Sequence, residues 1–537
     1  MGGFKPAIGI DLGTTNSCVS IVEDGVPQVI PNLWGDRIHA SVVFFPGDDQ
    51  VVVGNEAKRQ VILNPERTVW SIKRIVGRKS FSAEVKKAQS LCAYPIVEGV
   101  NYGVRIAIDE QMFSPEEISA FILREMKMLA TEYLGVAVDE AVITVPAYFN
   151  DNQRQATLDA GRIAGLKVLR MINEPTAAAL SYGYGRNLRQ RVAVYDLGGG
   201  TFDLSILEID GDIFEVLGTA GDSYLGGDDF DFRLLSHLSD RFLEDTGVDL
   251  RSDKFSLQKL REACEEAKKL FSSHDEVLVS IPDIIEDDMG AMKLEYLVTR
   301  EEFNGLVMDL VQRSFRVCDE ALHAARCTVQ DLDGVIMVGG PTRLPIVREA
   351  VGYYFGLEPD TSLNPDDVVA LGAGIHAAGL KQSGFSTDQT APHQTVGAHL
   401  LDVTPLSLQI ATVGGYTETI IERNTPIPIE RSRIFTTVRD GQDRVHLRVY
   451  QGESNREEEC TLLGEFIFSG FRIGNRGDVN IEVVFSIDAS GLVHVTARDL
   501  ESGKQQQITL TMSSALSENE IQEMMMRSDG MELAPKQ

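Results

Sequence analysis

The spacing of apolar residues changes along the chain, and each kind of spacing predicts a different element. Residues 114–117 read Ser-Pro-Glu-Glu, a helix start with a capping box, and apolar residues then recur at helical spacing as far as Leu129. Residues 141–145 form a short apolar run that Pro146 ends, as in a buried strand, and a helix is expected over residues 151–164. This succession of strands and helices predicts an α/β layer structure.

The pattern changes to strict alternation beyond Asp402. Short alternating runs with glycine turns between them predict a β sandwich, and the clearest runs are residues 444–449, 481–485 and 492–496. A capping box at residues 517–520 predicts a last helix that ends at about Arg527. We therefore expect four parts: an α/β domain over residues 1–385, a polar linker over 386–402, a β sandwich over 403–514, and a short helix with a tail over 515–537.

A glycine turn between two β-rich runs is the most informative stretch of the chain. Residues 196–203 read DLGGGTFD, and the flanking runs predict a hairpin. Three glycines let the backbone approach a bulky anion and turn its N–H groups toward it. Asp196 and Asp203 stand at the two ends of this turn. Two carboxylates beside a phosphate-sized cradle suggest a magnesium ion that is held through water.

The same pattern occurs near the start of the chain. Residues 9–16 read GIDLGTTN and lead into a second β-rich run, so that Asp11 aligns with Asp196 and Gly13 aligns with Gly198. Either copy alone is weak evidence, but two copies suggest two similar halves that clamp one nucleotide. Glycines 372 and 374 match a loose dinucleotide-binding pattern that follows a helix start instead of a strand, so we interpret them as close helix packing.

Composition excludes several classes of function. The 537 residues are too many for one core, so two or more domains are expected. A net charge of −30 argues against a nucleic-acid partner and against an anionic membrane, since both require a basic surface. The six cysteines form no Cys-x-x-Cys pair, no run is long enough to span a membrane, and no signal-peptide pattern is present. These features together predict a cytoplasmic protein.

Four motifs together resemble one known family. They are DLGTTNS at residues 11–17, VPAYFN at 145–150, NEPTAAA at 173–179 and the glycine-triplet hairpin. The chain resembles the seventy-kilodalton heat-shock chaperones of the DnaK type over nearly its whole length. The resemblance implies a two-lobed, actin-like α/β ATPase domain followed by an all-β sandwich that binds peptides. The helical lid of the family would be reduced here to the short last helix.

The resemblance also implies roles in a slow, partner-stimulated hydrolysis of ATP to ADP. Lys73, Glu174 and Asp196 would orient the attacking water, and Thr201 would face the γ-phosphate. Asp11 and Asp203 would hold Mg²⁺ through water, and K⁺ is a further candidate ion. The residues expected to bind the nucleotide are Gly13, Thr14, Thr15, Asn16, Gly199, Gly200, Thr201, Glu265, Lys268, Ser272, Gly339, Gly340, Arg343 and Asp366.

Simpler interpretations remain open for several of these residues. From position alone, Lys73 is a solvated surface lysine, Glu174 caps the helix that follows it, and each aspartate caps a turn. The peptide channel implied by the resemblance comprises Ile410, Thr412, Val413, Tyr416, Phe435, Val438, Val445 and Leu447. The alternative is that these alternating apolar residues form the core of the sandwich, and for Ile410 or Leu447 both interpretations can hold.

The expected function is that of an ATP-dependent chaperone for extended hydrophobic segments of unfolded proteins. The resemblance adds a GrpE-type exchange factor near Gly35 and a J-domain cochaperone, whose expected contacts are Tyr148, Asn150, Asp151, Arg170 and Asn173. The alternatives are a small-molecule kinase on the same fold, a filament-forming protein, and a dedicated regulatory chaperone that retains peptides weakly. Neither of the first two explains the β sandwich.

Overall fold

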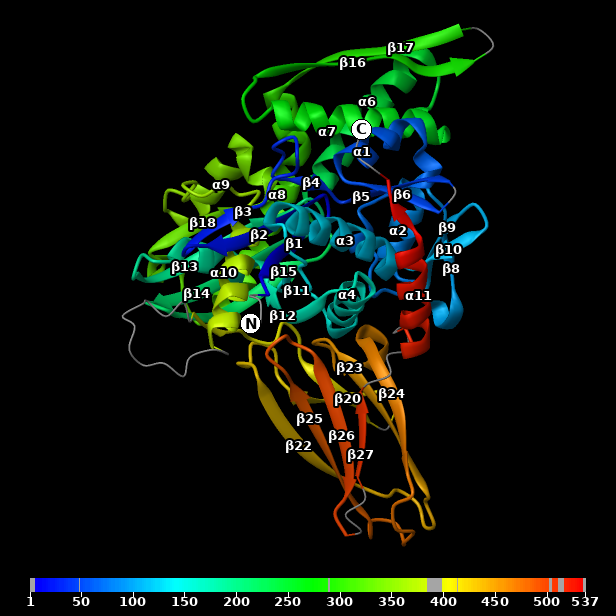
Figure 1. The fold of residues 1–537 in the computed structure, drawn as a ribbon, viewed down its shortest axis with the longest axis vertical. Coiled ribbons are helices and arrows are strands. Elements are labelled where there is room, and N and C mark those ends of the chain that lie inside the picture. The colour runs from blue at the N-terminus through cyan, green and yellow to red at the C-terminus, as the bar shows by residue number, and fades with distance from the viewer. Residues whose placement is uncertain are drawn as a thin grey trace.

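The computed structural model describes residues 5–47, 49–287, 290–383, 398–412, 414–501, 505–509 and 516–534. Figure 1 shows two α/β lobes side by side and a β sandwich that extends below them. This arrangement confirms the predicted fold class. We call residues 5–173 the first lobe, and residues 189–363 together with 399–401 the second lobe. No helix in the described ranges is both long and apolar enough to cross a membrane.

The first lobe is built on a mixed sheet with the strand order β12-β11-β1-β2-β3. Its strands are β1 (Ala7–Leu12), β2 (Asn16–Glu23), β3 (Val26–Val29), β11 (Glu140–Val145) and β12 (Lys167–Asn173). The expected helices are α3 (Pro115–Leu134), which begins with the predicted capping box at Ser114, and α4 (Asp151–Ile163). They pack against each other, and α3 also packs on β1 and β2.

The second lobe repeats this plan with the order β18-β13-β14-β15-β19. Its strands are β13 (Arg189–Leu197), β14 (Phe202–Asp210), β15 (Ile213–Asp222), β18 (Gly334–Val338) and β19 (His399–Leu401). In both sheets an antiparallel hairpin has a parallel neighbour on its first strand, β11 beside β1 and β18 beside β13. The largest helices of this lobe are α6 (Gly227–Thr246), α7 (Lys254–Leu270) and α8 (Arg300–Ala324).

Two helices pack against each other between the sheets. Helix α10 (Val368–Ser383) contacts β1 and β2, and α5 (Glu174–Gly183) contacts β13 and β14. A Cβ atom on Gly372 would lie 1.8 Å from the carbonyl oxygen of Ala177, so α10 approaches α5 as closely as only glycine permits. This confirms close helix packing for Gly372, whereas Gly374 lets α10 lie against Ser20 of β2.

The β sandwich has two four-stranded sheets around one apolar core. One sheet contains β20 (Leu408–Ala411), β21 (Thr417–Ile421), β23 (Arg444–Gln451) and β24 (Thr461–Ser469). The other contains β22 (Ile429–Thr436), β25 (Asn480–Ile487), β26 (Val493–Asp499) and β27 (Gln505–Thr509). Ile481, Val483 and Phe485 alternate inward along β25, as the sequence pattern predicted.

The end of the expected linker belongs to the second lobe. Residues 384–397 lie outside the described ranges, but β19 adds to the sheet edge in parallel with β15. Leu400 points inward and is 7% exposed, whereas Leu401 is 42% exposed. One strand therefore fastens the start of the β sandwich to the second lobe.

The last helix, α11 (Glu518–Gly530), lies on the first lobe against α3 and α4 (Figure 1). It runs past Arg527, where the sequence pattern predicted its end, because the guanidinium of Arg124 donates to the carbonyl oxygens of Ser528 and Met531 and satisfies the last turn. After it, β28 (Glu532–Leu533) pairs in parallel with β6 (Gln50–Val53), in a sheet that also contains β5 (Val42–Gly47) and β7 (Thr68–Trp70).

Candidate functional site

The two glycine turns meet where the lobes face each other. Asp11 lies near the end of β1, and Asp196 on β13 stands directly opposite Asp203 on β14. A Cβ atom on Gly199 would lie 1.9 Å from the Thr15 hydroxyl oxygen, so the turn of one lobe touches the turn of the other. The duplicated sequence pattern therefore forms one site from two hairpins.

Three carboxyl groups lie at this meeting point: Asp196 and Asp203 are buried, and Asp11 is partly exposed. Burial, followed by the nearby charge of Glu174, raises the pKa of both Asp11 and Asp203 to about 7. The same two causes raise the pKa of Asp196 well above its usual range. Asp11 accepts a hydrogen bond from the Thr144 hydroxyl at 2.9 Å. A carboxylate has about four acceptor sites, so all three groups can accept further hydrogen bonds.

A buried ion pair lies beside these carboxylates. Lys73, on the short 3-10 helix Ile72–Arg74, donates to Glu174 Oε1 at 2.5 Å. The exposed fractions are 7% for Lys73 and 8% for Glu174. The surface interpretation of Lys73 is therefore wrong. Glu174 does open α5, but its side chain pairs with Lys73.

Two neighbouring cavities bring most of the predicted site residues together. One of about 90 Å³ is lined by Asp11, Gly13, Thr14, Thr15, Asn16, Lys73, Glu174, Asp196, Gly199, Thr201, Gly339, Gly340 and Asp366. The other, of about 320 Å³, shares five of these and adds Glu265, Lys268, Ser272 and Arg343. Gly200 and Asp203 line neither cavity, although Gly199 and Thr201 of the same turn line the first one.

The polar residues of the larger cavity are already paired. Lys58, on α1 (Asn55–Leu63), donates to Glu265 at 2.7 Å and so bridges the two lobes. Burial raises the pKa of Glu265, but the ammonium groups of Lys58, Lys269 and Lys268 outweigh burial and hold that pKa well below its usual range. Arg343 forms an ion pair with Asp366 at 2.6 Å. The wall thus presents positive and negative groups in fixed positions.

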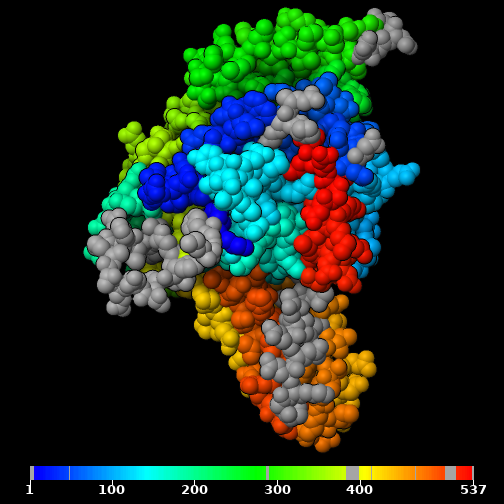
Figure 2. All heavy atoms as spheres, in the orientation of Figure 1, coloured from blue at the N-terminus to red at the C-terminus, as the bar shows by residue number. Residues whose placement is uncertain are grey.

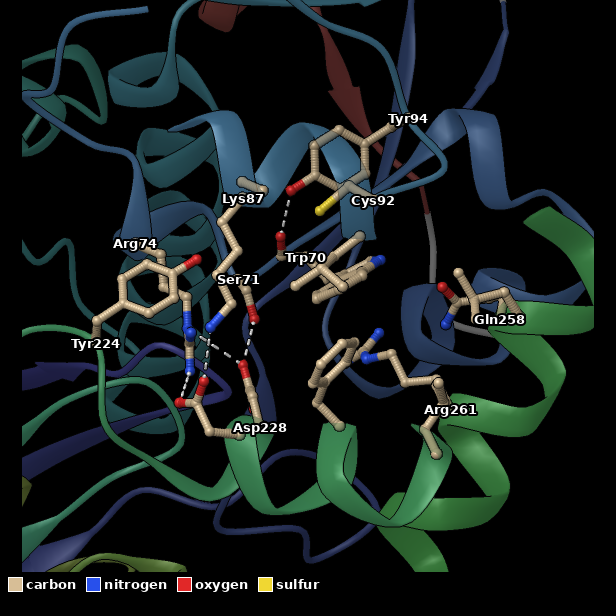
Figure 3. Close-up of a pocket in the computed structure, with 16 residues that line it drawn as sticks. Trp70, Ser71, Arg74, Lys87, Cys92, Tyr94, Tyr224, Asp228, Gln258 and Arg261 are labelled. Carbon is tan, nitrogen blue, oxygen red and sulfur yellow. Dashed lines mark hydrogen bonds and ion pairs between the residues drawn. The ribbon is translucent and has the colours of Figure 1, made fainter. Parts of the chain in front are cut away.

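A second set of bonds between the lobes was missed at the sequence level. Arg74 donates to Asp229 at 3.1 Å, and Ser71 donates to Asp228 at 3.0 Å (Figure 3). Arg74 also donates to the carbonyl oxygen of Gly199 at 3.2 Å. Arg74 and Ser71 belong to the first lobe, and the aspartates open α6 of the second. The sequence offered one signal for these residues, their positions along the chain: Arg74 follows Lys73 directly, and the aspartates follow a Gly-Gly pair.

A known family matches this chain over almost its whole length. The model of the family described as Hsp70 protein matches residues 7–537. The chain belongs to the Hsp70 family. Hsp70 proteins are in general ATP-binding chaperones with ATPase activity, so the predicted family and the predicted combination of two α/β lobes with a β sandwich are confirmed.

The predicted peptide residues of this Hsp70 chain divide into two groups. Ile410 and Leu447 are buried in the sandwich core, which confirms the core interpretation for them, and Phe435 and Val445 pack against that core. The remaining side chains are exposed or partly exposed, namely Thr412, Tyr416 at 48% and Val438 at 57%. Val413 lies outside the described residues.

Several of the residues expected to contact a J-domain cochaperone lie where the β sandwich packs against the first lobe. Asp151 accepts the Val493 N–H at 2.8 Å, and Asn173 donates to Asp402 at 3.0 Å. Both side chains are buried, and so is Arg154, which donates to the carbonyl oxygen of Ser490. Asn150 caps α4, whereas Arg170 and Tyr148 are partly exposed. Gly35, the expected exchange-factor contact, lies in an exposed turn.

Proposed function

We propose that this Hsp70 chain hydrolyses ATP and uses the energy to control its hold on extended hydrophobic segments of unfolded proteins. One observation carries the proposal: a buried Lys73–Glu174 pair lies beside three carboxyl groups, two of them buried, at the point where two glycine hairpins meet. Burying a charged group costs free energy unless the group pairs with another charge or binds a ligand. The concentration of such groups at the cavity of about 90 Å³, which adjoins the one of about 320 Å³, supports a nucleotide site.

In this proposal the nucleotide spans both cavities. The phosphates would lie against the smaller cavity, where N–H groups and hydroxyls are supplied by Gly13, Thr14, Thr15, Asn16, Gly199, Thr201, Gly339 and Gly340. Gly200, in the same turn, would add its N–H only from outside that lining. The nucleoside would occupy the larger cavity among Glu265, Lys268, Ser272, Arg343 and Asp366. Arg343 would stack on the base, and the polar groups on α7 would reach the ribose.

The donor set fits a magnesium ion. Mg²⁺ prefers carboxylate oxygens and keeps several waters, and Asp11 and Asp203 offer two such groups, whose pKa values are raised first by burial and then by the charge of Glu174. Among the residues that the structure describes, no group of three or more His, Cys, Asp or Glu side chains is placed to hold a metal directly. This agrees with an ion held largely through water. When bound, it would offset charge on the phosphates, and K⁺ remains a further candidate.

The protein's own part in hydrolysis would be positioning. Lys73 Nζ, held by Glu174, would orient the attacking water together with Asp196, whose pKa is raised by burial and then by the charges of Glu174 and Asp203. The Thr201 hydroxyl would stabilise the γ-phosphoryl group. Such catalysis rests on placement and charge stabilisation. It is slow unless a partner improves the placement, and J-domain and GrpE-type cochaperones would be those partners.

The β sandwich would bind the client. An extended peptide would make main-chain hydrogen bonds beside Thr412, Val413, Tyr416 and Val438, above a floor of Ile410, Phe435, Val445 and Leu447. We place the domain boundaries at residues 385, 402 and 514. We also place the protein in the cytoplasm, without nucleic-acid or membrane partners. A chaperone that serves one dedicated client, or one that retains peptides weakly, would be a variant of the same activity.

Single-turnover hydrolysis tests the proposal. Lys73→Ala should slow ATP hydrolysis at least tenfold, which corresponds to about 1.4 kcal/mol of barrier, and should leave ATP binding close to normal. Lys167→Ala is the matched control, because Lys167 is exposed on β12, remote from both cavities. A Lys73→Ala rate within threefold of wild type would refute the catalytic assignment. Phosphoryl transfer to a sugar or to acetate would instead support the kinase alternative.

A further inference from the structure

The two lobes touch at the glycine turn that joins β13 to β14. Figure 2 shows the first lobe (blue) and the second lobe (green) meeting in one continuous surface on this face of the molecule. We call residues 198–201 the second-lobe turn. Gly199 and Thr201 line the smaller cavity, so the position of this turn decides where its N–H groups and the Thr201 hydroxyl lie in the site.

One side chain of the first lobe, Arg74, reaches the second-lobe turn although it lines neither nucleotide cavity. Its Nη2 donates to the carbonyl oxygen of Gly199 at 3.2 Å. A Cβ atom on Gly200 would lie 2.7 Å from Arg74 Nε, so no side chain fits there while Arg74 keeps its place. The guanidinium therefore packs directly on the backbone of the turn.

Three neighbouring side chains fix the guanidinium of Arg74. Nη2 also donates to Asp229 at 3.1 Å, and Nε lies 3.5 Å from Asp228. The Tyr224 ring lies against the cation, with 4.9 Å between Arg74 Cζ and the ring centroid (Figure 3). Burial lowers the pKa of Arg74, but the carboxylates of Asp228 and Asp229 outweigh burial and raise that pKa above its usual value. Arg74 is thus a permanent, buried cation in a fixed position.

The second lobe holds the same turn with backbone bonds. The Asp228 N–H donates to the carbonyl oxygen of Gly199 at 2.8 Å, and within the turn the Gly198 N–H donates to that of Thr201 at 2.9 Å. The carbonyl oxygen of Gly199 therefore accepts one hydrogen bond from each lobe. The bond from Arg74 exists only while the lobes are together.

We propose that Arg74 is a positioning residue, which sets the second-lobe turn for hydrolysis when the two lobes are closed. Because Arg74 and the turn belong to different lobes, opening of the lobes breaks this bond and releases the turn on one side. Hydrolysis is thereby tied to lobe closure. The catalytic part of this inference rests on the proposed function, whereas the hold of Arg74 on the turn does not.

Loss of a positioning residue should slow hydrolysis more than it weakens binding. The nucleotide would be held by donors from several segments of both lobes, and a shift of one turn removes few of them. The transferred phosphoryl group depends more steeply on exact placement, here of the Thr201 hydroxyl and the N–H groups of the turn. A residue that only stabilised the fold would leave the rate of the folded molecules unchanged.

Three variants of the full chain separate positioning from stability. Arg74→Met removes the cation. Arg74→Lys keeps a cation beside Asp229, but a single ammonium does not replace the planar guanidinium that reaches both carboxylates and Gly199 together. Lys87→Met is the matched control, because the Lys87 ammonium donates from the first lobe to Asp229, at 3.2 Å, instead of to the turn.

Amide hydrogen exchange without nucleotide measures the hold on the turn, with the amides of Gly198 and Asp228 as reporters. Both Arg74 variants should speed exchange at these amides at least fivefold, and Lys87→Met should change it less than twofold. The thermal midpoint should fall in Arg74→Met, and Arg74→Lys should recover at least half of that fall. If Arg74→Met does not fold, Arg74→Lys still carries the test.

Single-turnover hydrolysis and ATP binding, measured well below the thermal midpoint, give the catalytic part. Both Arg74 variants should hydrolyse ATP at least tenfold more slowly than wild type, with a Kd for ATP within threefold of the wild-type value. Lys87→Met should keep both quantities within threefold.

Two results would overturn the inference. Hydrolysis that recovers together with the thermal midpoint in Arg74→Lys would assign Arg74 to stability alone. Slow hydrolysis with unchanged exchange at Gly198 and Asp228 would show that the substitution acts through the adjacent Lys73. A wild-type chain that does not hydrolyse ATP would refute the proposed function, and the exchange comparison, which contains no nucleotide, would still decide whether Arg74 holds the turn.

Discussion

Two neighbouring cations, Lys73 and Arg74, serve different parts of the site. Lys73 pairs with Glu174 beside the carboxylates, whereas Arg74 reaches the second lobe and holds the carbonyl oxygen of Gly199. Lys73 was found at the sequence level only through the family resemblance, since its partner is about a hundred residues away. Arg74 was missed because its one local signal is its place directly after Lys73, and its partner Asp229 is 155 residues away. Long-range pairing of this kind leaves no periodic signal in a sequence.

Arg74→Met should destabilise the α/β lobes. The variant leaves Asp228 and Asp229 without their buried guanidinium, and breaking a buried pair in this way costs about 3 kcal/mol, or roughly 4 °C in the thermal midpoint of a unit of about 385 residues. Differential scanning fluorimetry measures the shift. Arg59→Met, at an exposed position on α1, is the control and should shift the midpoint by no more than about 1–2 °C. Equal shifts for both variants would mean that the bridge between the lobes contributes nothing.

At the scale of elements, the structural features that the sequence predicted correctly are local ones. The capping boxes at Ser114 and Ser517, the paired hairpins around Asp11 and Asp196, and the alternation along β25 all appear in the structure. Their causes lie within a few residues, so a pattern can reveal them. The docking of β19 and α11 depends on surfaces that are made elsewhere in the chain. For that reason the end of α11 was predicted too early.

Strand β19 provides a matched pair of variants. Leu400→Asp would place a charge in the buried edge of the second lobe and lose an apolar contact of about 1.5–3 kcal/mol, so the sandwich should undock. Leu401→Asp, on the exposed side of the same strand, should have little effect. Stimulation of ATPase by an unfolded client measures the coupling. Full stimulation of the Leu400→Asp variant would show that this strand does not transmit the signal.

Docking of the sandwich should depend on pH through Asp151. Burial raises the pKa of Asp151 to about 7 from an ordinary value of 3.8, and Arg154, His494 and Asp488 are the charged groups near it. The docked state therefore binds this proton more tightly than the undocked state. Docking is strongest below about pH 4 and weakens as the pH rises through about 7.

The protection factor of the Val493 amide between pH 5.5 and 8 measures this dependence. It should fall with rising pH in wild type, and Asp151→Asn, which keeps the hydrogen-bond acceptor, should remove most of the change. The same slope in both proteins would assign the pH dependence to other groups.

At the scale of the whole molecule, α11 lies on the first lobe, and the channel residues Tyr416 and Val438 are exposed. A hydrophobic peptide should therefore leave quickly in either nucleotide state. We expect micromolar binding, because each buried apolar side chain contributes about 1.5–3 kcal/mol. Differences in affinity appear mostly in the dissociation rate, and we expect ADP to slow release less than tenfold relative to ATP.

Stopped-flow release of a fluorescent peptide measures both rates, with a peptide in which Asp replaces the central apolar residue as the control. Release that is a hundredfold slower in ADP would contradict an open channel and would require a cover that the described residues do not provide.

The pairing of β28 with β6 has a consequence for how the protein is made. Strands β5, β6 and β7 leave the ribosome early, but at about 5–20 residues per second β28 follows roughly 460 residues later, after about half a minute to a minute and a half. During that time the edge of β6 is unpaired, and an unpaired edge is a template for association with other chains. A protein proposed to shield the strands of others would thus pass through a stage of its own synthesis in which one of its strands needs shielding.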